Sequence, residues 1–489
     1  MKKRIHCSRP THKPLLWALG AGALLLGGGG CAVAPPDVPP VGIPDEYIFA
    51  QEGDTLVVVG AEWWEIFGDT TLNRLIATAL ERNNNLAIAA SKVAQAQEQL
   101  AAVRASFAPA IDIEADASAT YTTPTGASKK SIVQSYSLLP RVSWEFSLFG
   151  GVRASIEGAN EQYIATEWGY RATRLALEAQ VATTYFQWLQ YARSLEISER
   201  SYTLRQQAQQ KADSLYYYGY TSGVDLQQAR SLTATAAADI PAYRRAMVQT
   251  NLILNTLLGG EPELLPMPPH SRECTHSLGA QLDGLYCGHL TATPLPAYIP
   301  SGLPSSLLER RPDVMEAYHK LLSAAAQTQV ARAARLPSIA LTGEGGLLSS
   351  TLKGLTSKNP AYWTAALSLT QPLLRFGKLK ADEKMAFEQW RQASYAYRQT
   401  VLSALTDVES ALVAIESYNN QAERYIELLQ ANNSLRTMTA ALYADGLASS
   451  LNLIDAERNL YSSQLDYIAL LTEQLTAYVT LYKALGGGW

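Results

Sequence analysis

The chain has 489 residues, enough for one large core or for several elongated layers. Its formal net charge of −4 gives no sign of a nucleic-acid partner, which is usually matched by a basic protein. Charged residues make up only 17% of the chain, while alanine, glutamine and tyrosine are plentiful. The small side chain of alanine suits the close packing of long helices.

Residues 1–30 are expected to form a secretory signal peptide, because a basic start precedes a short apolar run and four glycines. Cys31 follows directly and resembles the lipidated first residue of a bacterial lipoprotein. Ala32 after it favours transfer to the outer membrane. The leucine usual three positions before the cysteine is Gly28 here, so an ordinary signal peptide with a bystander cysteine is the alternative. We expect no transmembrane helix after this signal, because no other run reaches about 18 apolar residues.

Residues 31–62 are rich in proline and valine and are expected to form an extended leader. The first structural repeat is expected over 63–260. It opens with an aromatic cluster, interpreted as structural packing. Asp69 can then cap a helix that ends before Pro109, with the asparagines at 83–85 as a candidate interruption.

The pattern then changes from helix to strand. Apolar and polar residues alternate along 111–121 and again along 136–148, which predicts a β-hairpin at 110–149. Each strand has about ten or more residues, the length that crosses a bilayer when tilted. A soluble, half-buried hairpin is the alternative, but strand length and terminal aromatics favour the membrane. Five acidic residues fall on polar strand faces and would make a lumen electronegative: Asp112, Glu114, Asp116, Glu145 and Glu344.

Two very long helices are predicted, over 152–218 and 380–445. In the second, apolar residues step by four and three along a heptad seam, formed by Val401, Leu405, Val408, Leu412 and Ile415. A helix of this kind would be roughly 95 Å long at 1.5 Å per residue. Each long helix ends at a tight, glycine-containing break and is followed by a shorter helix, over 224–258 and 451–485.

Landmarks of the first half recur in the second at an offset of 227 residues, which indicates a duplication. The matching pairs are Phe149-Gly150 with Phe376-Gly377, Gly219 with Gly446, and Gly259 with Gly486. The second repeat is therefore expected over 306–489, with its hairpin at 338–375. Residues 261–305 are expected to form a segment between the repeats, at the middle (equator) of the long helices.

The lengths of the elements favour one arrangement. The helices before each hairpin and after each tight break are about half as long as the long helix, so they would match it if stacked end to end. The hairpins then lie at one end and the tight breaks at the other. Four strands cannot close a barrel, since about eight is the smallest number, and lipid does not tolerate open edges. A chain whose hairpins enter a membrane must therefore oligomerise.

Two motifs where the second repeat begins, Leu303-Pro304-Ser305 and Arg310-Arg311-Pro312-Asp313, are similar to a family signature. Together with the duplication and the aromatic opening, they resemble the TolC-like outer-membrane efflux channels, in the lipoprotein (NodT-type) branch of tripartite RND efflux systems. The resemblance implies a mainly α fold with a small β part. It implies a homotrimer that forms a coiled-coil tunnel and a transmembrane β-barrel, with four strands from each chain. It also implies a periplasmic adaptor, an inner-membrane RND-type transporter and outer-membrane lipid as partners, with no cofactor and no catalysis.

The resemblance also implies a periplasmic gate near the second tight break. The apolar constriction position falls on Leu451, the acidic ring position on Asp455, and a tyrosine of the closed-state hydrogen-bond network on Tyr443. Three carboxylates around a threefold axis repel one another and attract cations, so such a ring can filter and open. From the sequence alone, a solvated aspartate without a role is the simpler interpretation.

The sequence departs from the family at two gate positions. A second acidic ring used by some members is Asn452, and an arginine that locks the closed state in some members is Ala448. The tips around Gly219, Gly223 and Gly446 are the expected docking surface for the adaptor.

Cys274 and Cys287 lie in the proline-rich segment between the repeats, close to His276 and His289. In an oxidising periplasm the two cysteines would form a disulfide that closes a short loop. A Cys/His zinc site is the alternative, with suitable ligand types but irregular spacing.

Three functions are compatible with these patterns. The first is an exit duct of an efflux pump for drugs or other toxic small molecules. The second is a type I-like protein-secretion duct, against which the lipoprotein signal and the two motifs argue. The third is a periplasmic coiled-coil scaffold without a pore, which leaves the bilayer-length hairpins unexplained. No nucleophile–base arrangement or phosphate-binding loop points to an enzyme.

Overall fold

The computed structural model describes residues 36, 42–44, 47–49, 62–122, 131–264, 310–356 and 361–487. The chain divides into two compact units. The first comprises Met1–Pro39, Ala96–Tyr163 and Lys320–Ser394, and the second Pro40–Gln95, Ile164–His319 and Tyr395–Trp489. The expected signal peptide, with Cys31, and the segment with Cys274 and Cys287 lie outside the described residues.

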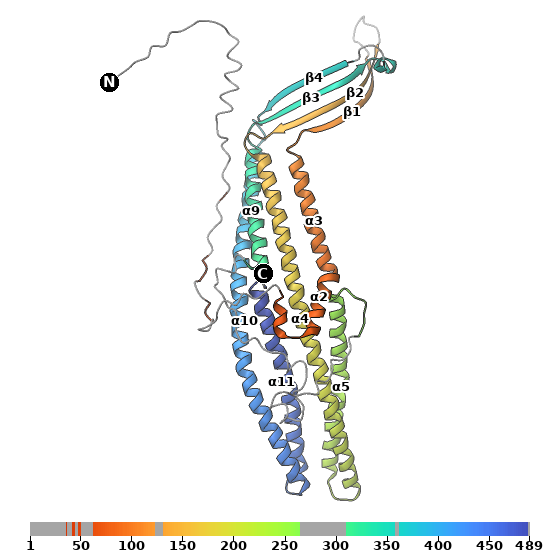
Figure 1. The fold of residues 1–489 in the computed structure, drawn as a ribbon, viewed down its shortest axis with the longest axis vertical. Helices are drawn as coiled ribbons and strands as arrows, with labels where there is room; N and C mark the ends of the chain where they lie inside the picture. Colours follow the sequence, from red (N-terminus) through yellow and green to blue (C-terminus); the bar gives the residue numbers. More distant parts are fainter. Residues whose placement is uncertain are drawn as a thin grey trace, which may run out of the picture. The chain divides into compact units, whose positions relative to one another are not determined.

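Helices dominate the described chain and have matching lengths in its two halves (Figure 1). The helices α4 (Gly151–Tyr217) and α10 (Lys378–Ala444) have 67 residues each, and α5 (Gly223–Leu257) and α11 (Ser450–Ala484) have 35 each. The helices α10 and α11 begin and end 227 residues after α4 and α5, as in 378 − 151. None of the described helices has the length and apolar character needed to cross a membrane.

Shorter elements precede the hairpins. They are a 3-10 helix, η1 (Trp63–Phe67), then α2 (Thr70–Arg82), α3 (Asn84–Ala105) and α9 (Pro312–Ala333). Asp69 caps α2 as predicted, with its Oδ1 accepting from the backbone N–H of Thr71 at 2.8 Å. The helix expected up to Pro109 is divided at Asn83, whose backbone is extended and whose Oδ1 caps α3 by accepting from Leu86 N–H at 3.0 Å.

The first unit contains one antiparallel sheet in the order β1-β2-β3-β4 (Figure 1). Its strands are β1 (Ala110–Thr122), β2 (Ser131–Phe146), β3 (Ser338–Ser349) and β4 (Ala361–Thr370), with a 3-10 turn, η3 (Leu352–Thr356), before β4. The two predicted hairpins are joined through β2 and β3, where Trp144 lies opposite Leu341. Each outer strand has one neighbour among the described strands. Large apolar side chains stand exposed on these outer strands: Ile111, Ile113, Trp363, Leu367 and Leu369.

Small residues bring α4 and α9 together within the first unit. A Cβ atom on Gly158 would lie 3.2 Å from the Cβ atom of Ala326. The hydroxyl of Ser323 donates to the Gly158 carbonyl at 2.8 Å. The predicted close approach of long helices therefore has a specific cause here, since a larger residue at 158 would push α9 away.

An aromatic cluster forms the core of the second unit, as predicted for the segment that opens the first repeat. Trp63 stacks on Tyr482 with ring centroids 5.7 Å apart, and Phe67 meets Phe186 edge-on at 5.2 Å. Two polar atoms of this core have buried partners: the Tyr185 hydroxyl donates to Asp69 Oδ2 at 2.8 Å, and Trp63 Nε1 donates to Glu178 Oε2 at 3.2 Å. Stacked and edge-on ring pairs of this kind stabilise a core beyond their buried area.

The predicted heptad seam of α10 is buried in the second unit, with one shift. Val401, Val408, Leu412 and Ile415 are each at most 4% exposed. Leu405 is half-buried, and its neighbour Ala404 takes the buried place. A change of one position is expected because 3.6 residues per turn do not divide a heptad evenly.

The helix ends meet as the length argument predicts. At the end of α5, the carbonyl of Leu257 accepts from Asn83 Nδ2, directly before α3, at 2.8 Å. At the end of α11, the carbonyl of Ala484 accepts from Arg311 Nη1, directly before α9, at 3.1 Å. Arg311 also binds Asp313 and Asp407 and is only 8% exposed, so this part of the signature motif is structural.

Candidate gate at the helix tips

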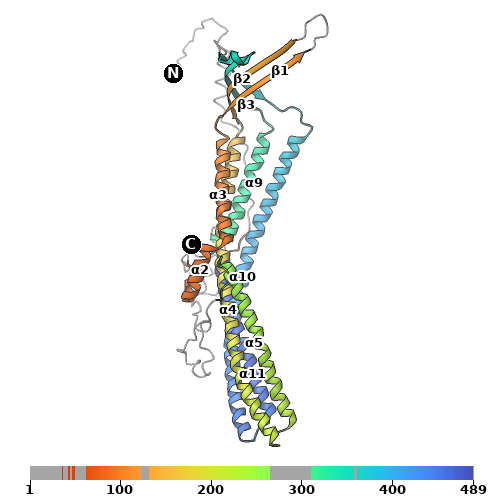
Figure 2. The same cartoon turned by 90° about the vertical axis from the view of Figure 1, so that its right-hand side faces the viewer.

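The lower end of the second unit consists of two helical hairpins, α4–α5 and α10–α11, and α5 lies beside α11 (Figure 2). Both turns have a glycine in the left-handed conformation, Gly219 with φ 75° and Gly446 with φ 74°. In each, the next residue closes the helix: Tyr220 N–H donates to Leu215 O, and Leu447 N–H to Leu442 O, both at 2.8 Å. This is a Schellman-type ending, which requires glycine for its positive φ.

Gly223 plays a different role from the two turn glycines. It is the first residue of α5, and a Cβ atom there would meet the Tyr216 ring at 3.5 Å, an ordinary contact. Glycine is therefore not needed at 223 for either backbone conformation or space.

A capping box begins α5. The hydroxyl of Ser222 accepts from Asp225 N–H at 3.1 Å, and Asp225 Oδ2 accepts in return from Ser222 N–H at 3.2 Å. The same oxygen also accepts from the hydroxyls of Ser222 at 2.6 Å and Thr221 at 3.0 Å. Asp225 Oδ2 thus accepts hydrogen bonds from Thr221 and Ser222 of the turn that precedes α5.

The second oxygen of Asp225 connects the two hairpins. Its Oδ1 accepts a hydrogen bond from the hydroxyl of Ser450, the first residue of α11. Hydrogen bonds from Ser222 and then Ser450 lower the pKa of Asp225 to about 2. We call this cross-hairpin bond between Asp225 and Ser450 the clasp.

The three residues placed at the gate by the resemblance have different surroundings. Tyr443 lines a cavity of about 250 Å³ together with Asp225 and Ser450. Leu451 is 49% exposed, and the carboxylate of Asp455 lies 3.0 Å from Arg458 Nη2 on the same helix. The structure therefore brings Tyr443 to the clasp, while Leu451 and Asp455 do not line that cavity.

Sequence reasoning missed Asp225 and Ser450. The spacing of Ser222 and Asp225 was a visible signal, because serine followed three residues later by an acidic residue can form a capping box. The bond to Ser450 had no such signal, since the two residues are 225 positions apart.

Within the described residues, no group of three or more His, Cys, Asp or Glu side chains is arranged to hold a metal ion. The cysteine pair and its two histidines fall outside them, so the choice between disulfide and zinc site stays a prediction.

The model of the family described as "Outer membrane efflux protein" matches residues 75–260 and 303–487, which is most of the chain. The chain belongs to the outer membrane efflux protein family. The two matched ranges correspond to the two halves described above.

Named relatives cover nearly the whole chain. It is 32% identical to the solvent efflux pump outer membrane protein SrpC of Pseudomonas putida, over 94% of this chain and 96% of the relative. It is 30% identical to the cation efflux system protein CusC of Escherichia coli, with the same coverage. The open-state crystal structure of the Neisseria gonorrhoeae MtrE outer membrane channel superposes with a TM-score of 0.79 at 28% identity, covering 94% of this chain and 98% of that one.

The family assignment confirms the predicted fold class, localisation and function. The protein is an outer-membrane channel of an efflux pump, built from a helical tunnel and a β-barrel, and it extends into the periplasm. The family consists of transport proteins.

Proposed function

We propose that three copies of this chain close one barrel and form the exit duct of a tripartite pump for small toxic molecules. Channels of this family work as trimers with a periplasmic adaptor and an inner-membrane pump. For this chain we propose an adaptor at the helix tips and an RND-type transporter as the energy source.

The observation that carries this proposal is the sheet of the first unit. Its outer strands, β1 and β4, each have one described neighbour and carry exposed apolar side chains such as Ile113 and Leu367. An unpaired strand edge in hydrocarbon leaves backbone groups without hydrogen bonds, at a cost of several kcal/mol per group. Pairing β4 of one copy with β1 of the next removes every edge, and three sheets of four strands suffice for a closed barrel.

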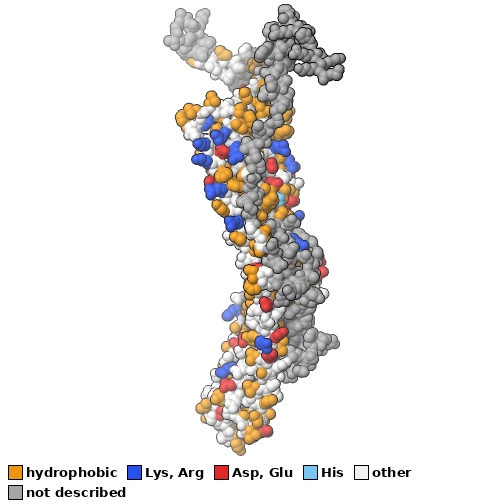
Figure 3. All heavy atoms as spheres, turned by 90° about the vertical axis from the view of Figure 1, so that its left-hand side faces the viewer, with side chains coloured by type: hydrophobic (Ala, Val, Ile, Leu, Met, Phe, Trp, Pro, Cys, Tyr) orange, Lys and Arg blue, Asp and Glu red, His pale blue; other side chains and the backbone are white. Residues whose placement is uncertain are grey.

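The surface at the helix tips supports adaptor docking there. Aromatic and apolar side chains are unusually exposed around both turns: Tyr217, Tyr218, Tyr220 and Leu447 are 83%, 71%, 80% and 76% exposed. Figure 3 shows hydrophobic side chains at this end of the second unit. Exposed apolar patches with polar surroundings are typical of protein-binding surfaces. We propose that the turns at Gly219 and Gly446, with the start of α5 at Gly223, form this docking surface.

We propose that the clasp holds the resting tip closed. A charged hydrogen bond between Asp225 and Ser450 ties the first hairpin to the second, so the hairpins cannot separate without breaking it. Tyr443 lies beside this bond, and Leu451 and Asp455 narrow the aperture once three copies surround an axis. Arg458 pairs with Asp455 and so weakens the repulsion between the three Asp455 carboxylates of a ring. The clasp then contributes more than this ring to the stability of the closed state.

We also propose that Cys31 is lipidated with palmitate, which anchors the chain to outer-membrane lipid. Labelling cells with a palmitate analogue tests this, since label should be incorporated into the wild-type chain and be absent from Cys31→Ser.

A susceptibility panel tests the function. The chain and its neighbouring pump would be expressed in a strain without other efflux ducts, against dyes, antibiotics, solvents, detergents and metal ions. Relatives named for solvents and for cations leave the substrate class open. We expect resistance to at least one class, lost on deletion of this chain. Unchanged resistance together with loss of a secreted polypeptide would instead indicate protein export.

A further inference from the structure

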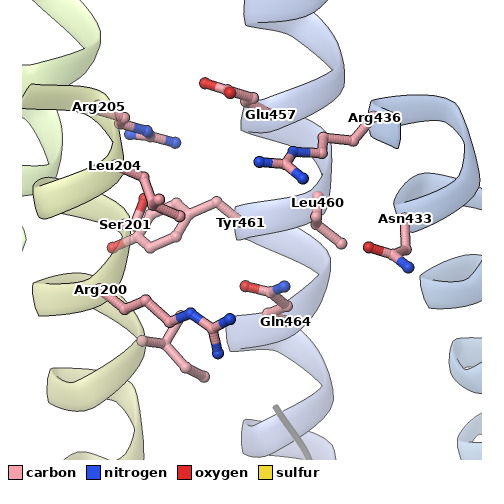
Figure 4. A pocket seen from close by; sticks show the side chains of 11 residues that line it. Arg200, Ser201, Leu204, Arg205, Asn433, Arg436, Glu457, Leu460, Tyr461 and Gln464 are labelled. Carbon is pink, nitrogen blue, oxygen red and sulfur yellow. The ribbon is translucent and has the colours of Figure 1, made fainter. Parts of the chain in front are cut away.

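A second cavity, of about 230 Å³, lies farther along the same helices and shares Arg205 and Glu457 with the clasp cavity. The helix α11 forms its floor, and α4 and α10 form its sides (Figure 4). Arg200 and Arg205 reach it from α4, and Arg436 reaches it from α10. In Figure 4 the guanidinium groups converge on this space from opposite sides.

The lining of this cavity is basic, with three arginines and one carboxylate, Glu457 of α11. Glu457 lies between Arg205 and Arg436 in Figure 4, and Asp239 acts electrostatically on Arg205 as well. Arg200 also has interactions within the chain, so a bound carboxylate would add to these contacts rather than replace a missing one. Burial raises the pKa of Glu457, although Arg436 and Arg205 lower it, so this carboxylate is itself poorly solvated.

One of the arginines is held rigidly. Arg205 is 5% exposed, its Nη1 donates to the Leu232 carbonyl at 3.2 Å, and its guanidinium lies 4.7 Å from the centre of the Tyr461 ring. Tyr461 in turn donates to Asp239 Oδ2 at 2.9 Å. A guanidinium fixed by stacking and hydrogen bonding loses little entropy on binding a ligand, which favours a defined anion site.

The rest of the lining is apolar or neutral. Ile197, Leu204, Leu460 and the Tyr461 ring supply hydrocarbon surface, and Gln464 and Asn433 supply neutral amides. The volume equals that of roughly eight waters at about 30 Å³ each, which accommodates a compact organic ion. Arginine forks pair with carboxylates through two parallel hydrogen bonds, and apolar walls exclude a fully hydrated inorganic ion.

We propose that this cavity is a binding site for a small organic anion, such as an aromatic carboxylate. The carboxylate lies between the arginines of α4 and Arg436 of α10, and the hydrocarbon part lies against Leu204, Leu460 and Tyr461. A ligand held in this way bridges the long helix of the first half to the α10–α11 hairpin of the second. Binding of the anion requires neither the adaptor nor the pump, so it can be measured on this chain alone.

Calorimetric titration of the purified, detergent-solubilised protein tests the site with benzoate as the probe. We expect saturable binding of benzoate, with neutral benzyl alcohol and inorganic phosphate each binding at least tenfold more weakly. Arg436→Gln should weaken benzoate at least tenfold, the size expected for a lost charged hydrogen bond. The matched control is Arg424→Gln, an exposed arginine of the same helix paired with Glu427, which should leave affinity unchanged.

Glu457→Gln separates a binding role from a structural one. Removing the single carboxylate of the lining should tighten benzoate severalfold, an outcome that general destabilisation would not produce. Equal benzoate affinity in the wild type and Arg436→Gln, or no saturable binding of benzoate, would overturn the proposal. Phosphate that binds more tightly than benzoate would also overturn it, by assigning the cavity to inorganic anions.

Discussion

The two helix tips have the same backbone but different chemistry. Both turns use a left-handed glycine, and both following helices begin with a serine N-cap, Ser222 and Ser449. At the position three residues later, the first tip has Asp225 and the second has Asn452. One residue after the cap, the first tip has Gly223 and the second has Ser450.

These two differences together make one bond. The first tip contributes a carboxylate and the second a hydroxyl, and neither tip could form the clasp with a copy of itself. The two hairpins have the same turns, but they differ at two positions, Asp225 against Asn452 and Gly223 against Ser450. These two differences make the contact between the hairpins asymmetric. A substitution that makes either tip resemble the other should therefore break the bond between Asp225 and Ser450 and let the two hairpins separate.

Asp225→Asn makes the first tip resemble the second and should have the largest effect. The amide keeps part of the cap but loses the charge that strengthens the bonds from Ser222, Thr221 and Ser450, which is worth about 1.5–3 kcal/mol for charged hydrogen bonds. We expect single-channel conductance in planar bilayers to rise severalfold, because the hairpins separate more easily.

The control for this variant is Asp213→Asn, on the same hairpin. Its carboxylate forms an exposed ion pair with Arg230 at 2.9 Å, and such pairs contribute little. Conductance should stay at the wild-type level. If Asp225→Asn also conducts like the wild type, the clasp does not hold the tip.

Acid should act on the same bond without a mutation. The pKa of Asp225 is lowered from an ordinary 3.8 to about 2 by its hydrogen bonds. A carboxyl with a depressed folded pKa stabilises the fold above its unfolded pKa, and this contribution is lost as pH falls through the folded pKa. Conductance measured against pH should therefore rise between about 4 and about 2. Asp225→Asn should lack this step, and a step of the same size in both proteins would assign the transition to other groups.

Ser450→Ala removes the hydroxyl of the second tip and should have a smaller effect. Asp225 keeps its capping bonds to Ser222 and Thr221, so only the cross-hairpin bond is lost, at about 1–2 kcal/mol. Conductance should rise, but less than in Asp225→Asn. The equivalent change in the first tip is Gly223→Ala, whose added Cβ atom has room beside Tyr216. A larger effect from Gly223→Ala than from Ser450→Ala would contradict the asymmetry of the two tips.

The same contrast explains what the sequence could predict. Helices, hairpins and turns follow from local periodicity and from glycines such as Gly219 and Gly446, whose positive φ is a property of a few residues. The end-to-end stacking of the shorter helices followed from their lengths, which are about half the length of the long helices. The clasp and the arginine cavity could not be predicted, because they depend on how side chains of separate helices face one another.

Individual residues show where this limit lies. Arg205 and Arg436 each look like ordinary solvated arginines within a helix, and only the packing of α4, α10 and α11 brings them to one cavity. Asp455 was selected by resemblance, and its partner Arg458, three residues on, changes what a ring of such carboxylates can do. The three-residue spacing of Asp455 and Arg458 was visible in the sequence. That the two side chains form an ion pair, and so change the charge at the gate, is visible only in the structure.

The combined variant Leu451→Ala and Asp455→Ala should have the smallest effect of the series. Neither side chain lines the clasp cavity, and the Asp455–Arg458 pair is exposed enough to contribute at most about 1 kcal/mol. The variant leaves Asp225 bonded to Ser450, so the hairpins stay tied, and we expect a modest rise in conductance from a wider aperture. Adding Asp225→Asn should then raise conductance further. If the combined variant alone conducts as freely as Asp225→Asn, the ring of Leu451 and Asp455 closes the duct and the clasp is secondary.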